Sequence, residues 1–102
     1  MITITFKSKE GLCRGFDALG HAGYGPEGQD IVCAAVSALT QGTVSAIREL
    51  SSSDTNIECQ SGNLKLRIRD PDQIALILLA GLETALQDLL AEYGAYVEVC
   101  HG

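Results

Sequence analysis

Residues 64–73 read LKLRIRDPDQ, and this short stretch contains both kinds of element that the fold requires. Its first six residues alternate apolar and basic side chains, a period of two that predicts a strand with one buried face. The remaining four are a helix start signal, in which Asp70 is the expected N-cap, proline takes the first helical position and Gln73 follows three residues after the cap. A strand that leads directly into a helix predicts a mixed α and β fold.

The sequence on both sides of this stretch predicts the remaining elements. A strand at 55–60 should pair with the strand at 64–69 around the turn at 61–63. The long helix that the quoted stretch begins should stop at Gly94. The other expected elements are strands at 2–7, 12–20 and 95–100 and an amphipathic helix at 31–50. Gly15 predicts a bulge or bend in the second of these strands. We therefore expect an α+β fold with two layers, in which two helices cover one face of a mostly antiparallel five-stranded sheet in the order ββαββαβ.

Length, charge and hydropathy exclude several classes of protein. The chain has 102 residues and a mass of 10.8 kDa, which predicts a single domain over 1–102. Seven Lys and Arg against thirteen Asp and Glu give a net charge of −6, so we expect no direct contact with nucleic acid. The longest apolar run, Ile74–Leu82, is far shorter than the ~20 residues of a membrane span, which predicts a core helix and no membrane contact. This run is apolar on nearly every face, so part of it should pack against the other helix or a second subunit.

The number of cysteines bears on the cellular compartment in which the protein works. There are four of them, an even number that would suggest two disulfides in a secreted chain. Residues 1–7, however, alternate apolar and polar side chains instead of forming a basic leader and an apolar run. We therefore expect a cytoplasmic protein with reduced thiols.

Residues that could perform chemistry gather around a glycine-rich segment at 20–30. His101 is next to last, where order is least expected, which leaves His21 as the candidate histidine. Asp30 is a good N-cap, and Cys33 then lies in the first helical turn, where unpaired amides and the macrodipole favour a negative charge. A helix start and a neighbouring imidazolium are the environments that activate cysteine nucleophiles. The alternatives are that Cys33 is a small packed residue, that His21 has no chemical role and that Asp30 is only a cap.

Other motifs give weaker signals. Residues 23–28, GYGPEG, fit the G-x-G-x-x-G pattern, but the preceding strand belongs to a hairpin and Glu27 would face a bound pyrophosphate, so no dinucleotide is expected. The cysteines and histidines lack metal-ligand spacing, so neither a metal nor another cofactor is expected. Lys65, Arg67 and Arg69 form a basic stripe, which is either a solvated face or a contact for an acidic or RNA-rich partner.

One part of the chain is similar to a known family. Gly20-His21-Ala22, then Gly28, then residues 30–39, DIVCAAVSAL, resemble the signature of Prp, the bacterial ribosomal-processing cysteine proteases. The predicted order of elements is similar to that family over essentially the whole chain.

Carried over residue by residue, the resemblance implies that Cys33 is the nucleophile and His21 the general base. Asp30 matches the acid of the signature and Ser37 its serine. The resemblance also implies an activity: removal of the N-terminal extension of large-subunit ribosomal protein twenty-seven, by cleavage after an aromatic pair. Members of the family are homodimers, so a second copy is an expected partner.

The mechanism that these residues suggest leaves two questions open. The Cys33 N–H is the expected oxyanion donor, but Asp30 would occupy it as a cap, whereas an Asp30 turned toward His21 would orient the ring. The glycine-rich segment is expected to be disordered without peptide and to close over bound substrate. Its candidate substrate-binding residues are Gly20, Gly23, Tyr24, Gly25 and Gly28.

Two other classes of function compete with a protease. One is a non-catalytic ribosome-assembly or adaptor module that uses the basic stripe. The other is a thiol redox or metal sensor that uses Cys33.

Overall fold

The computed structural model of the chain describes residues 1–102 and has the predicted order of elements. These elements are β1 (Ile2–Lys9), β2 (Leu12–Gly20), α1 (Ile31–Leu50), β3 (Thr55–Gln60), β4 (Asn63–Ile68), α2 (Gln73–Tyr93) and β5 (Val97–His101).

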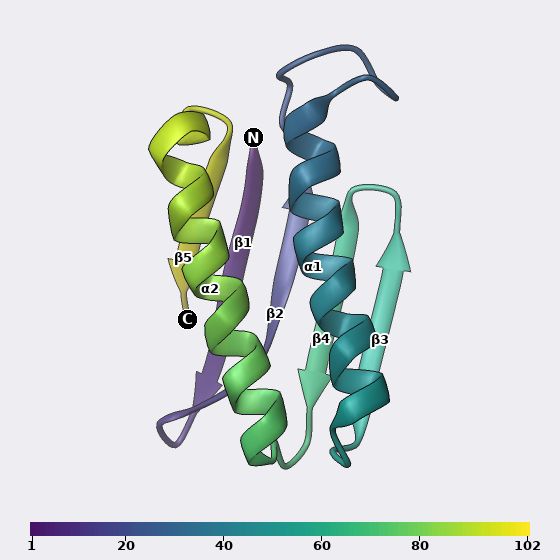
Figure 1. Ribbon diagram of the computed structural model, residues 1–102, viewed down its shortest axis with the longest axis vertical. Helices are drawn as coiled ribbons and strands as arrows, with labels where there is room; N and C mark the ends of the chain where they lie inside the picture. Colours follow the sequence, from purple (N-terminus) through teal and green to yellow (C-terminus); the bar gives the residue numbers. More distant parts are fainter.

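The strands form one sheet in the order β3-β4-β2-β1-β5. Three of its neighbouring pairs are antiparallel, whereas β5 runs parallel to β1, so the sheet is mixed. Both helices lie on the same face of this sheet and pack against each other (Figure 1). The predicted two-layer α+β architecture is therefore confirmed.

The core forms where the two layers meet. Alternate residues of β1 and β4 point into it, as their period of two predicts, and these are Ile2, Ile4, Phe6, Leu64, Leu66 and Ile68. α1 contributes Val32, Val36 and Ile47, and α2 contributes Leu79 and Leu86. Aliphatic side chains at helical spacing thus face aliphatic side chains at strand spacing, and their burial is the main stabilising contribution.

The start of α2 differs from the prediction by two residues, because the N-cap is Asp72 and not Asp70. The Asp72 carboxylate accepts hydrogen bonds from the Ala75 N–H at 2.9 Å, the Ser51 hydroxyl at 2.8 Å and the Ser52 N–H at 2.9 Å. The last two donors belong to the loop after α1. A contact between distant segments therefore decides which aspartate is the cap. The predicted stop at Gly94 is confirmed.

The C-terminal strand also differs from the prediction. It begins at Val97 and not at residue 95, because the Tyr96 N–H closes a turn onto the Tyr93 carbonyl at 2.9 Å. His101 is ordered within this strand, contrary to expectation. Its Nε2 lies 2.6 Å from Glu83 Oε1, and its ring stacks on Phe6 with centroids 5.8 Å apart.

The predicted irregularity in β2 is confirmed at Gly15. The register of β1 against β2 shifts between Phe6 and Ser8, opposite this glycine. Gly15 has φ +136°, and a Cβ there would overlap the Leu66 carbonyl oxygen of the neighbouring strand. Only glycine fits this close approach of two strands.

By length and apolar composition alone, both α1 and α2 could cross a membrane. The core helices of soluble proteins can be equally long and apolar. Both helices contribute buried residues to the core and pack against each other, and Ile74 and Ile77 remain exposed on α2. The apolar run thus contributes Ala75, Leu79 and Leu82 to the core, in a helix that packs against α1.

One end of the sheet brings together segments that are far apart in the sequence. β2 ends there, α1 begins there, and the β3–β4 turn lies beside them at the upper end of Figure 1. The Gly20 N–H donates to the Gly62 carbonyl at 2.9 Å and so ties the end of β2 to that turn. This hydrogen bond therefore holds in place the backbone from which the glycine-rich segment starts.

Candidate active site

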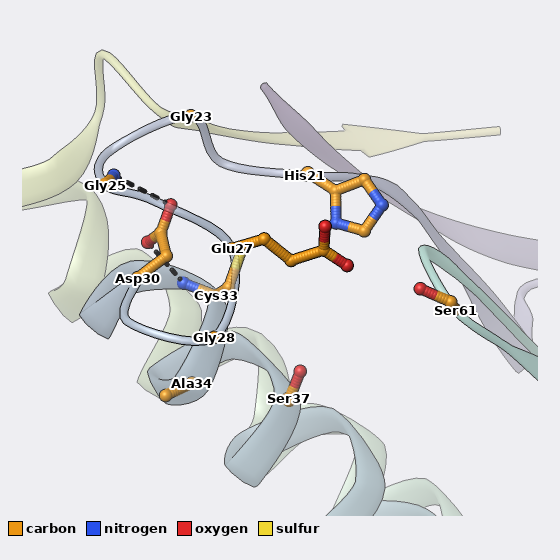
Figure 2. Close-up of a pocket in the computed structure, with 10 residues that line it drawn as sticks. All are labelled: His21, Gly23, Gly25, Glu27, Gly28, Asp30, Cys33, Ala34, Ser37 and Ser61. Carbon is orange, nitrogen blue, oxygen red and sulfur yellow. Dashed lines mark hydrogen bonds between the residues drawn. The ribbon is translucent and has the colours of Figure 1, made fainter.

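A cavity of about 550 Å³ opens at the start of α1, between the glycine-rich segment and the β3–β4 turn (Figure 2). Its walls come from three places in the chain. The lining residues are His21, Gly23, Gly25, Glu27, Gly28, Asp30, Cys33, Ala34, Ser37 and Ser61. The thiol and the imidazole that the sequence singled out therefore share one cavity.

Cys33 lies in the first turn of α1, half-buried against the core. The Ala22 N–H donates to its Sγ at 3.3 Å. A sulfur that accepts a hydrogen bond at a helix start is in surroundings that suit an anion. His21 immediately precedes Ala22 and is exposed at the cavity, so one peptide carries the imidazole and also holds the sulfur.

The Asp30 carboxylate is saturated by backbone donors. Its Oδ1 accepts from the N–H groups of Val32 at 2.9 Å and Cys33 at 3.0 Å. Its Oδ2 accepts from the N–H groups of Tyr24 at 2.8 Å and Gly25 at 3.1 Å. The Cys33 N–H first, and then the other three donors, hold the pKa of Asp30 below its ordinary value. This one side chain thus caps α1 and also fixes the glycine-rich segment to the helix.

These contacts bear on the role of Asp30, which the sequence left open. Asp30 acts as the cap and makes no hydrogen bond to His21. The Cys33 N–H, which was expected to donate to an oxyanion, instead donates to Asp30. In this structure the Cys33 amide is therefore not available to a substrate.

Two of the candidate substrate-binding residues do not line the cavity. Tyr24 points to the far side of its segment, where it makes edge contacts with Tyr93 and Tyr96 at centroid distances of 5.6 and 5.0 Å. Gly20 ends β2 and packs closely against the carbonyl of Met1. Gly23, Gly25 and Gly28 do line the cavity, and so does Ser37, one turn after Cys33.

Sequence reasoning did not place Glu27, Ala34 and Ser61 at the site. The Glu27 side chain extends from the glycine-rich segment toward the His21 ring in Figure 2. Ala34 simply follows Cys33 on the helix. Ser61 comes from the β3–β4 turn, and the sequence identified that turn without any signal of what it would contact.

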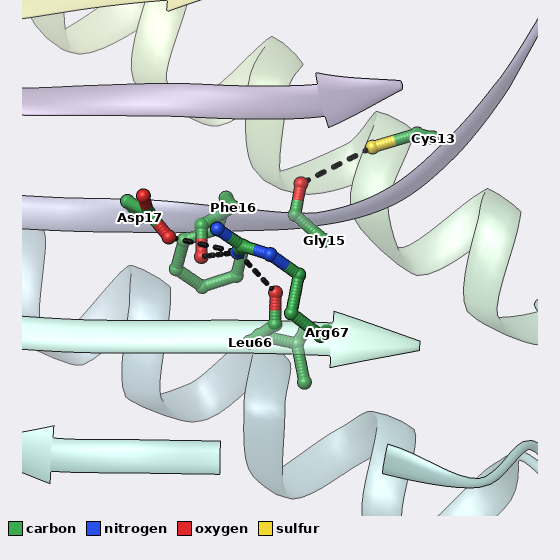
Figure 3. Close-up of polar contacts among 6 residues, drawn as sticks. All are labelled: Cys13, Gly15, Phe16, Asp17, Leu66 and Arg67. Atoms are coloured by element: carbon green, nitrogen blue, oxygen red, sulfur yellow. Dashed lines mark hydrogen bonds and ion pairs between the residues drawn. The ribbon is translucent and has the colours of Figure 1, made fainter. Parts of the chain in front are cut away.

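The basic stripe on β4 is partly neutralised within the fold. Arg67 Nη1 lies 2.7 Å from Asp17 Oδ1 and also donates to the carbonyls of Phe16 and Leu66 (Figure 3). Lys65 stands directly opposite Asp17 on β2 and Glu58 on β3 in the strand register. Opposite charges therefore alternate across this face of the sheet.

The other three cysteines lie outside the cavity, and all four are free thiols. Burial raises the pKa of Cys13, and burial together with the neighbouring Glu98 raises the pKa of Cys100. Cys59 is exposed on β3. Cys33 is thus the one cysteine that combines a helix start, a donor to sulfur and a cavity shared with histidine.

A thiol at a helix start, facing a cavity that it shares with an imidazole, defines a candidate enzyme of the cysteine-nucleophile class. Residues 1–98 match a protein family described as "Cysteine protease Prp". The chain belongs to this family and is a cysteine protease.

Two kinds of relative support this assignment. A ribosomal processing cysteine protease Prp from Staphylococcus aureus (strain Mu50) is 38% identical over 84 residues, which cover 78% of each chain. Two crystal structures of the essential ribosomal processing protease Prp from S. aureus cover 100% of both chains. One holds a covalently linked product peptide (TM-score 0.93, 30% identity) and the other a substrate peptide (TM-score 0.88, 29% identity).

Proposed function

We propose that this protease is a ribosomal-processing endopeptidase, in which Cys33 is the nucleophile and His21 the general base and acid. The observation that carries the proposal is the placement of both side chains in one cavity, with the Ala22 N–H donating to Cys33 Sγ. The substrate we propose is the N-terminal extension of large-subunit ribosomal protein twenty-seven, cut after an aromatic pair. The relatives described as ribosomal processing proteases support this substrate class.

The reaction would proceed through a thioester. The Cys33 thiolate attacks the scissile carbonyl carbon, and protonated His21 gives its proton to the departing amine nitrogen as the C–N bond breaks. Neutral His21 then takes a proton from water, the hydroxide attacks the thioester carbon, and the carboxylic product leaves as the thiolate is restored. A related enzyme that holds a covalently linked product peptide supports a nucleophilic route.

Asp30 and Ser37 take supporting roles in this proposal. Asp30 keeps α1 and the glycine-rich segment in register, because its four hydrogen bonds all go to backbone amides of those two segments. Ser37 presents a hydroxyl to the cavity one helical turn beyond the thiol. Gly23, Gly25 and Gly28 provide a wall along which a peptide backbone could run without side chains in its way.

The decisive experiment incubates an extension peptide that contains the aromatic pair with four proteins: wild type, Cys33→Ser, His21→Ala and the matched control Cys59→Ser. Mass spectrometry should find one cut after the pair with wild type and with Cys59→Ser. Cys33→Ser and His21→Ala should be slower by about a thousandfold or more. Intact peptide after incubation with wild type, or equal cleavage by Cys33→Ser, would refute the proposal.

We also propose that the chain acts as a homodimer in the cytoplasm. Ile74 and Ile77, which are 44% and 59% exposed on α2, support a second copy because large apolar side chains are seldom left in water in neighbouring helical turns. Sedimentation equilibrium should give a mass of twice 10.8 kDa. A species of 10.8 kDa at micromolar concentration would contradict the dimer.

The two competing functions find less support. An adaptor that uses the basic stripe would have to compete with Asp17 and Glu58 for the same cations. A redox switch that forms an intramolecular disulfide needs a second thiol within reach, and none of the other three cysteines lines the cavity.

A further inference from the structure

The β3–β4 turn contacts the His21 imidazole. A Cβ built on Gly62 would lie 2.7 Å from His21 Nε2, 3.2 Å from Cε1 and 3.4 Å from Cδ2. The first distance is shorter than any that real Cβ atoms tolerate, so the ring occupies space that exists only because residue 62 has no side chain. The Nε2 edge of the imidazole therefore rests against the turn.

This contact orients the two ring nitrogens differently with respect to the turn. Nδ1 is not among the three ring atoms nearest to a Cβ on Gly62, and Figure 2 shows a ring nitrogen on the side of the glycine-rich segment and α1, away from Ser61. Cys33 lies on that same side of the cavity.

The position of the turn relative to His21 is itself fixed. The Gly20 N–H donates to the Gly62 carbonyl at 2.9 Å, and Gly20 is the residue directly before His21. Ser61, which directly precedes Gly62 in the turn, directs its hydroxyl toward the cavity in Figure 2. The backbone that carries the imidazole and the surface on which it rests are thus joined by a hydrogen bond.

We propose that Gly62 is a positioning residue of this protease: its missing side chain provides the seat that holds the His21 ring with Nδ1 toward Cys33. The proposal deepens the function given above and rests on His21 as the general base. It predicts that any side chain at position 62 displaces the ring, because an imidazole at the end of a side chain yields more easily than the backbone of a hairpin. A base displaced by about 1 Å can lose roughly a hundredfold in rate while the fold remains intact.

The chain contains a matched control for this test. Gly11 stands at the second position of the other two-residue hairpin turn and has φ +79°, close to the +70° of Gly62. A Cβ at Gly11 would meet nothing within 4 Å. Gly11→Ala and Gly62→Ala therefore introduce the same backbone strain, and only the second introduces a contact with His21.

The experiment compares wild type, Gly11→Ala, Gly62→Ala and Cys33→Ala on the extension peptide, with Tm measured for each. The two glycine variants should lose similar thermal stability. Gly62→Ala should lower kcat about 10–100-fold with KM within about twofold, and slow iodoacetamide alkylation of Cys33, whereas Gly11→Ala should leave both rates within about twofold of wild type. A second matched pair, Gly62→Asn and Gly11→Asn, repeats the comparison with a residue that accepts the left-handed conformation, in case Gly62→Ala does not fold.

The outcomes separate this proposal from the proposed function. Equal kcat and equal Cys33 alkylation in Gly62→Ala and Gly11→Ala, while Cys33→Ala is inactive, would overturn the role of Gly62 alone. Cleavage that survives in Cys33→Ala would overturn the mechanism. If wild type does not cleave this peptide, the substrate is wrong, and the alkylation comparison still decides the role of Gly62.

Discussion

The Ala22 N–H, near the start of the glycine-rich segment, donates a hydrogen bond to Cys33 Sγ across 3.3 Å. Ala22 is itself buried, so this donor is held in place by the core. The peptide unit between His21 and Ala22 therefore connects the two proposed catalytic side chains. Any movement of the end of β2 would change the imidazole position and the sulfur contact together.

The first prediction concerns the reactivity of the four thiols. Cys33 should react with iodoacetamide at pH 7 at least about tenfold faster than the exposed Cys59, because it has a donor to sulfur, a helix start and a nearby imidazole. Cys13 and Cys100 should react more slowly than Cys59, because their raised pKa values leave less thiolate at that pH. Peptide mapping by mass spectrometry measures all four rates in one sample, and His21→Ala should remove most of the advantage of Cys33. Equal rates for Cys33 and Cys59 would contradict this account.

The second prediction tests Asp30 as a connector of two segments. In Asp30→Asn the side-chain oxygen can still cap α1, but the amide nitrogen then faces the N–H groups of Tyr24 and Gly25, donor against donor. The segment at 21–29 should loosen, with faster amide exchange, and KM should rise about tenfold while kcat changes less.

The matched comparison for this prediction is Asp30→Ala, which removes the cap as well. It should lower both Tm and kcat further than Asp30→Asn does. Unchanged amide exchange at Tyr24 and Gly25 in Asp30→Asn would show that the carboxylate does not hold the segment.

The third prediction follows from the carboxylate of Asp72. The Ala75 N–H first, and then Ser52 and Ser51, hold its pKa below the ordinary value. Stability from this group is fully present above its unfolded pKa of about 4 and is lost as pH falls through the lower folded value. Asp72→Asn should therefore lower Tm by about 5 °C at pH 7, and the difference from wild type should shrink below about pH 4. Thermal melts of both proteins between pH 2 and pH 7 measure this Tm difference. A difference that stays constant with pH would contradict the stabilising role of the ionised Asp72 carboxylate.

The fourth prediction concerns the ion pair between Arg67 and Asp17. Arg67 is 44% exposed and Asp17 is 13% exposed, so solvent screens the pair and a double-mutant cycle should give a coupling of about 0.5 kcal/mol. Cleavage of the extension peptide by Arg67→Ala should stay within about twofold of wild type, because the pair lies on the open face of the sheet. A large loss of cleavage without loss of stability would contradict this prediction and show that Arg67 takes part in substrate binding.

Local features of the sequence determined much of this molecule. The alternation in residues 2–7 and 64–69 specified which strand face is buried, because side chains of a strand alternate strictly between its two faces. Asp30 before an apolar helix specified where α1 begins, and that start places Cys33 in its first turn. These inferences needed only neighbours in the chain.

Contacts between distant segments decided the rest. Asp72 rather than Asp70 caps α2 because the loop after α1 supplies two of its donors. Ala22 meets the sulfur, and Gly62 meets the imidazole, because the end of β2 and the β3–β4 turn meet at one end of the sheet. Sequence spacing carries no information about such long-range contacts, since they depend on the order of strands in the sheet. The sequence by itself therefore predicted which thiol and which histidine form the candidate site, and only the tertiary structure decided what surrounds and orients them.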